Sequence, residues 1–82
     1  MNKYQYIVRF ESYSESVGSC RDRWEEETFQ DPTEAYGYAK MNSRLEKSKT
    51  EVVNLLEEKG SVYERHQDGN EVICISIRKI TN

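Results

Sequence analysis

The stretch Asp31-Pro32-Thr33-Glu34 is a helix-start signal, and it constrains the fold of this chain more than any other segment. Asp31 suits the N-cap because its carboxylate accepts backbone N–H groups of the first turn. Pro32 suits the first helical position, where its missing N–H is not needed, and Glu34 is placed to complete a capping box. The residues that then recur at helical spacing predict one face packed on a sheet: Ala35, Tyr38, Ala39, Asn42 and Leu45.

The segments before this helix have the alternation of β-strands. Residues 3–12 place Tyr4, Tyr6, Val8 and Phe10 on one face, which is typical of a half-buried strand. Residues 23–30 predict a second strand, at a sheet edge because three adjacent glutamates disfavour a central position. Trp24 and Phe29 cannot share one face of a regular strand. Either a bulge separates them or Phe29 belongs to the turn before the helix.

A β-hairpin is expected near the C-terminus. Asp68-Gly69 favours a positive-φ turn between strands at 62–66 and 71–80. The second of these strands is apolar on both faces, so we expect it in the centre of the sheet, beside the N-terminal strand. One of its faces carries Ile73, Ile75 and Ile77, and the other carries Val72, Cys74 and Ser76.

Residues 46–59 allow two interpretations. The helix continues to Lys59 and ends at Gly60, but this places Lys49 in the buried stripe. Alternatively, the helix ends near Ser48, at a length of about 17 residues that is nearer the typical value, and Glu51–Leu56 is a strand. We favour the second interpretation. It predicts a single α+β domain over residues 1–82, with an antiparallel sheet in the order β-β-α-β-β-β and one helix packed on one face.

Composition and charge restrict the class of partner. The chain has 15 acidic and 12 basic residues and a net charge of -3, which is too balanced to favour nucleic acid. No apolar run approaches the roughly 20 residues of a membrane span, and the N-terminus shows no secretory leader. We therefore expect a cytoplasmic protein, in a host cell if it is phage-encoded. Cys20 and Cys74 are expected to be free thiols, with a lone disulfide as the alternative.

No residue cluster predicts an enzyme, a cofactor or a metal site. A Cys–His pair would need Cys20 or Cys74 to reach His66, and nothing in their spacing supports it. Cys20 does not begin a phosphatase loop, because Glu26 stands where that loop needs arginine. Adjacent glutamates on a strand point to opposite faces, so Glu25, Glu26 and Glu27 cannot converge on one ion.

Three surfaces are candidates for partner contact. An acidic surface next to the 12–22 loop is formed by Asp22, Trp24, Glu25, Glu26, Glu27 and Asp31. A basic helix stripe, suited to phosphates or an acidic protein, is formed by Tyr36, Lys40, Arg44 and Lys47. A sheet face left uncovered by the single helix, and therefore a possible dimer face, carries Ile7, Val72 and Cys74.

In general character the chain resembles small phage-encoded accessory proteins, including anti-CRISPR inhibitors. The resemblance is carried by the single small domain, six tyrosines, the acidic Trp24-to-Phe29 strand and the Asp31-to-Ala35 helix start, without a specific motif. It implies a stoichiometric inhibitor of a host defence or nucleic-acid-processing protein. We predict a non-enzymatic protein-binding module that acts through the acidic strand and the 12–22 loop. The alternatives are an RNA- or DNA-binding module that uses the basic helix stripe, and a homodimeric structural subunit.

Overall fold

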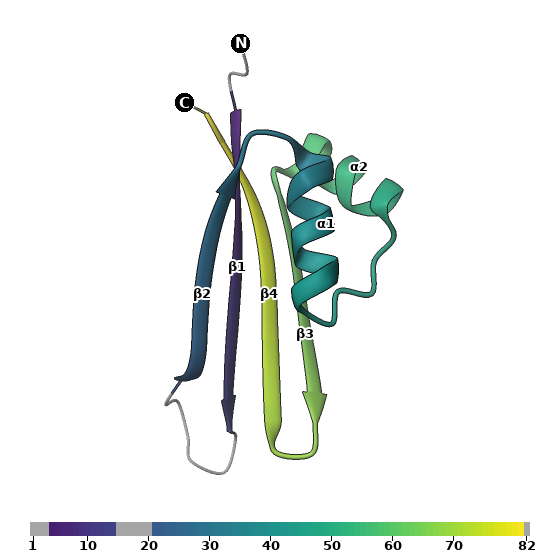
Figure 1. Cartoon of the computed structure of the whole chain (residues 1–82). Helices are drawn as coiled ribbons and strands as arrows, with labels where there is room; N and C mark the ends of the chain where they lie inside the picture. The colour runs from purple at the N-terminus through teal and green to yellow at the C-terminus, as the bar shows by residue number, and fades with distance from the viewer. Residues whose placement is uncertain (1–3, 15–20, 82) are drawn as a thin grey trace.

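Residues 4–14 and 21–81 are described by a computed structural model, and they form an antiparallel sheet with helices on one face (Figure 1). In chain order the elements are β1 (Tyr4–Ser14), β2 (Arg21–Phe29), α1 (Pro32–Asn42), α2 (Lys49–Lys59), β3 (Ser61–Asp68) and β4 (Glu71–Thr81). The four described strands lie in the order β2-β1-β4-β3. The α+β class and the antiparallel sheet predicted from the sequence are thus confirmed.

The first and last strands pair along their whole length in the centre of the sheet. Their antiparallel register runs from Tyr4 opposite Thr81 to Ser14 opposite Glu71. The central position expected for the C-terminal strand is therefore confirmed. The hairpin between β3 and β4 is also confirmed, and its two-residue loop begins with Gly69 at a φ of 63°.

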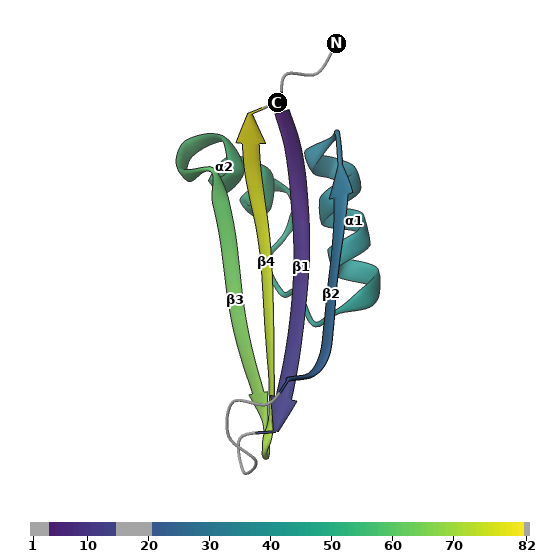
Figure 2. The same cartoon turned by 90° about the vertical axis from the view of Figure 1, so that its left-hand side faces the viewer.

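The core lies between the sheet and the helices. Val8 and Phe10 of β1 meet Ile75 and Ile77 of β4 side by side, and Val62 of β3 extends the same face. The helices cover this face with Ala35, Ala39, Val52 and Leu56, all of which are buried. The opposite face carries no helix in the described part of the chain, and Figure 2 shows both helices behind the sheet from that side.

Strand β2 lies at the sheet edge, as predicted, but neither explanation for the spacing of Trp24 and Phe29 is correct. The register with β1 is unbroken from Ser12 opposite Arg23 to Tyr6 opposite Phe29. The two aromatic positions therefore belong to opposite faces of a regular strand. Phe29 ends β2 and packs on Tyr38 of α1, with ring centroids 5.1 Å apart.

Helix α2 corrects the prediction for residues 46–59. The strand predicted at Glu51–Leu56 is wrong, and the described element order is β-β-α-α-β-β rather than β-β-α-β-β-β. The Ser48 hydroxyl caps the helix by accepting the N–H of Glu51 at 3.2 Å, and Gly60 ends it in the left-handed region with a φ of 76°. The continuous-helix alternative had the correct end, but the chain breaks at residues 43–48, which leaves Lys49 exposed.

Helix α1 begins as expected and ends earlier. The Asp31 carboxylate accepts the N–H of Thr33 at 2.7 Å, and Ala35 and Ala39 are fully buried. Asn42 is exposed at the last helical position, and Leu45 is buried from the loop that follows. At 11 residues each, neither α1 nor α2 has the length and apolar character needed to cross a membrane.

Two glycine substitutions should change stability in opposite directions. Gly60→Ala should lower the free energy of unfolding by about 1 kcal/mol, because an L-residue is strained in the left-handed region. Gly37→Ala, within α1 and with no heavy atom within 4 Å of the added Cβ apart from chain neighbours and the helix's own backbone, should raise it by about 0.5–1 kcal/mol. Urea unfolding followed by circular dichroism measures both. Equal effects of the two substitutions would contradict the assigned helix end at residue 60.

Candidate functional site

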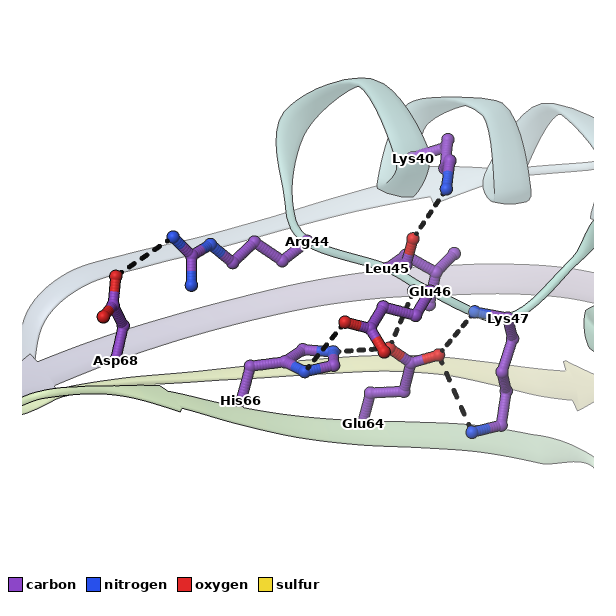
Figure 3. Close-up of polar contacts among 8 residues, drawn as sticks. All are labelled: Lys40, Arg44, Leu45, Glu46, Lys47, Glu64, His66 and Asp68. Carbon is purple, nitrogen blue, oxygen red and sulfur yellow. Dashed lines mark hydrogen bonds and ion pairs between the residues drawn. The ribbon is translucent and has the colours of Figure 1, made fainter.

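A buried carboxylate on β3 holds the loop that joins the helices. Glu64 accepts the backbone N–H of Glu46 on Oε1 and that of Lys47 on Oε2, each at 2.9 Å (Figure 3). His66 Nε2 donates to Glu64 Oε1 at 2.6 Å, and Lys47 Nζ lies 3.6 Å from Glu64 Oε2. We call Glu46, Lys47, Glu64 and His66 the Glu64 cluster. It fixes the 43–48 loop against the edge of the sheet.

Glu64 is only 6% exposed, and its contacts keep it charged. Burial by itself raises the pKa of a carboxyl group. The hydrogen bonds from Glu46, His66 and Lys47, together with the nearby Lys47 charge, outweigh burial and hold the pKa of Glu64 below its ordinary value. A carboxylate with these partners serves as a structural tie, since its lone pairs are already engaged.

The predicted basic helix stripe is not formed. Arg44 and Lys47 lie in the 43–48 loop after α1 has ended, and Tyr36 packs against the core. Each cation also has an internal partner. Lys40 Nζ donates to the Leu45 carbonyl at 3.0 Å, and Arg44 Nη2 lies 3.2 Å from Asp68 Oδ2, as Figure 3 shows. The shorter helix is the physical reason, because its end removes the helical spacing that the stripe required.

His66 has a role that sequence reasoning missed. We expected a surface residue, but its side chain is 19% exposed and lies between Glu64 and Glu46, with Nδ1 3.9 Å from Glu46 Oε2. The available signal was strand alternation, which places Val62, Glu64 and His66 on one face. A charged residue that follows a core valine on the same face needs partners.

His66 and Cys74 lie on opposite faces of the sheet. His66 is on the helix-covered face, opposite Ile73 of β4, whereas Cys74 faces away from the helices, opposite Arg65. This arrangement leaves no Cys74–His66 pair; Cys20 lies outside the described residues. Within the ranges 4–14 and 21–81, no three His, Cys, Asp or Glu side chains gather as a metal site would need.

A hollow of about 450 Å³ lies beside the Glu64 cluster at the outer edge of β3. It also contacts Glu51, Tyr63 and Arg65. Acidic and basic groups alternate around it, so it presents no single charge to a ligand. The 43–48 loop and α2 line the hollow on one side, and β3 lines it on the other.

The predicted acidic surface is divided between the two faces of β2. Glu25 and Glu27 lie opposite Phe10 and Val8 on the helix-covered side, and Glu26 lies opposite Arg9 on the other side. Tyr38 Oη donates to Glu25 Oε1 at 3.4 Å, whereas Glu26 and Glu27 are exposed. Asp31 is engaged as the N-cap of α1. The side chains of Asp22 and Trp24, and loop residues 15–20, lie outside the described part of the chain.

The face without helices, which we call the open face, contains the predicted residues Ile7, Val72 and Cys74. Its described members are Gln5, Ile7, Arg9, Glu11 and Tyr13 of β1, Glu26 and Thr28 of β2, Ser61, Tyr63, Arg65 and Gln67 of β3, and Val72, Cys74, Ser76, Arg78 and Ile80 of β4. Val72 is fully buried, while Ile7 and the free thiol of Cys74 are half-buried.

Tyr63 and Cys74 contact one another across neighbouring strands of the open face. Tyr63 Oη lies 3.3 Å from Cys74 Sγ, although 59% of Tyr63 is exposed. The hydrogen bond to the Cys74 sulfur, with partial burial, raises the pKa of the Tyr63 phenol. Tyr63 is therefore a neutral aromatic residue on this surface at physiological pH.

Replacing Glu64 should loosen the 43–48 loop. Glu64→Gln should lower the free energy of unfolding by about 2 kcal/mol, because two backbone donors lose a charged acceptor. Glu46→Gln is the matched control. Its side chain is 79% exposed, and His66 is its one ion-pair partner among the described residues, so its effect should stay below about 0.5 kcal/mol. Urea unfolding of both variants at neutral pH tests this, and equal losses would contradict the role of Glu64.

The stability contributed by Glu64 should depend on pH in a defined direction. Its pKa is lower in the folded chain, so the contribution is complete above about pH 5 and disappears as pH falls through the folded-state pKa. From about pH 5 down to about pH 3, the free energy of unfolding should fall more for wild-type protein than for Glu64→Gln. Parallel acid titration curves for the two proteins would show that Glu64 is not the group involved.

No protein-family model, curated protein or solved structure matches this chain. The charges, contacts and exposed surfaces described above are therefore the basis for proposing a function.

Proposed function

We propose that this chain is a non-enzymatic protein-binding module that contacts a basic surface of a larger protein through its acidic edge strand, β2. The observation that carries this proposal is a difference between basic and acidic side chains in whether they have partners within the fold. Three cations of the helix region are engaged within the fold, while exposed carboxylates of β2 are not.

The three cations of the predicted basic helix stripe all have partners within the fold. Lys40 bonds the Leu45 carbonyl, Arg44 pairs with Asp68, and Lys47 approaches Glu64. A phosphate backbone would have to compete with these partners for each cation. This distribution favours a protein partner over RNA or DNA.

On the acidic side, Glu26 and Glu27 are exposed and have no ion-pair partner among the residues that the structure describes. Unpaired carboxylates at a rim raise the rate of association with a basic surface. They also oppose pairing of β2 with another copy of itself, because like charges would lie opposite one another.

The position of β2 at the sheet edge is a second observation that supports the proposal. Among the described strands, β2 pairs only with β1, so its outer backbone groups are available to a partner. An extended basic segment of another protein is one structure that such an edge accepts. The narrower expectation, an inhibitor of a host defence or nucleic-acid-processing protein, stays a prediction from general resemblance.

Charge reversal on β2 tests the proposal. Tagged wild-type protein, Glu26→Lys/Glu27→Lys and the control Glu57→Lys/Glu58→Lys are used to capture proteins from lysate of the source cells, with and without nuclease. The control reverses two adjacent, exposed glutamates of α2. Mass spectrometry should identify a stoichiometric protein bound by wild type and control. The β2 variant should bind it at least about tenfold more weakly in titration.

Two outcomes would overturn the proposal. Equal affinity of all three proteins for the captured partner would remove β2 from the contact. Loss of the partners on nuclease treatment, together with binding of wild type to a bare oligonucleotide, would identify nucleic acid as the ligand.

A further inference from the structure

We infer that the open face of the sheet binds a second copy of this chain, with a two-fold axis that runs parallel to the strands between β1 and β4. This inference goes beyond the proposed function, because it concerns the open face as a whole and does not depend on the partner of β2. Glu26 belongs to both surfaces. Three features of the open face support it: its half-buried apolar and aromatic side chains around the exposed Tyr63, its division of charge and its area.

The open face has the composition of an interface. Ile7, Tyr13, Cys74 and Ile80 are half-buried although no described helix covers them, and Tyr63 is 59% exposed. Arginines are interspersed with these side chains at positions 9, 65 and 78. Tyrosine and arginine are enriched at protein interfaces, where each combines a large contact area with a polar group.

The open face has two halves of different charge, and the boundary between them runs parallel to the strands, between β1 and β4. The β3–β4 half carries Arg65 and Arg78 and has no acidic residue at its described positions. The β1–β2 half carries Glu11 and Glu26, and Arg9 on this half lies 3.0 Å from Glu11 through Nη2 and Oε1. Among the side chains that the structure describes, one half is therefore basic, and the other has one more acidic group than basic groups.

This division selects one symmetric arrangement. A two-fold axis parallel to the strands places β2 of one copy over β3 of the other, so each acidic half faces a basic half, twice in the dimer. A two-fold axis across the strands would place β2 over β2 and acidic half over acidic half, which like-charge repulsion disfavours.

The area of the face is sufficient for a specific dimer. Strands β1 and β4 have 11 residues each. At about 3.3 Å per residue and about 4.8 Å between strands, the face covers about 500–700 Å² per copy. A dimer would bury about 1,000–1,400 Å² in total, which meets the size of about 1,000 Å² expected of a biological interface.

The test is a charge exchange measured by sedimentation velocity over micromolar concentrations. Wild-type protein should dimerise. Arg65→Glu/Arg78→Glu makes the whole face acidic, and Glu26→Lys makes it basic overall. Each variant alone should dimerise at least tenfold more weakly than wild type. Mixed in equal amounts, the two variants should form a one-to-one heterodimer, because opposite faces then meet.

Circular dichroism confirms that each variant is folded before sedimentation. A wild-type monomer up to millimolar concentration overturns the inference. A dimer that Arg65→Glu/Arg78→Glu leaves intact places the interface elsewhere and also overturns it. Folded variants that fail to associate when mixed refute the strand-parallel axis. Arg65→Glu/Arg78→Glu retains Glu26 and Glu27, so it should still capture the protein that binds β2 even when it no longer dimerises. Capture therefore tests the proposed function separately from dimerisation.

Discussion

The pairing of the first strand with the last is the interaction on which this fold depends. β1 and β4 meet over 11 positions, and each also begins or ends a hairpin, with β2 or with β3. The core face of both strands is formed by the same pairs, Val8 with Ile77 and Phe10 with Ile75. The chain must therefore close over most of its length before its core is complete. Such long-range closure costs conformational entropy that burial of these residues offsets.

Polar side chains complete the fold where apolar residues are scarce. The charged fraction of 33% is close to the hydrophobic fraction of 35%, so part of the structure has to be held by polar contacts. The 43–48 loop illustrates this. Glu64 binds two of its backbone N–H groups, and Lys40 binds one of its carbonyls. A sequence pattern would assign Lys40 and Glu64 to the solvent-exposed surface, but both side chains bind this loop. By contrast, Glu26 and Glu27 of the acidic edge strand are exposed.

Both helices cover the same face of the sheet, and this one-sided arrangement leaves an edge strand and an open face of different character. The edge strand β2 presents backbone groups and carboxylates, whereas the open face presents aromatic side chains and arginines over a wider area. Like charge on β2 opposes its self-association, while the divided charge of the open face permits it. A homodimer formed through the open face would leave both outer β2 edges accessible.

The sequence by itself determined those parts of the fold that depend on neighbouring residues. Asp31 caps α1, alternation sets the faces of β1 and β4, and Gly69 turns the last hairpin, because each effect acts within a few residues. For the apolar run at 52–56 the strand interpretation that we favoured is wrong, since a short run of this kind fits a buried strand or a helix and the structure has a helix there. The tertiary structure decided it.

Tertiary contacts also decided the positions of the charged candidate residues. Glu64 is distant in sequence from the loop that it binds, so local spacing does not reveal this contact. The start of α2 did have a local signal, because Ser48 and Glu51 have the spacing of a capping box. Once that loop is fixed, Ser48 caps α2, and Val52 and Leu56 pack on the sheet. Local spacing specifies caps, turns and strand faces, whereas the partner of a buried charge is specified only by the folded chain.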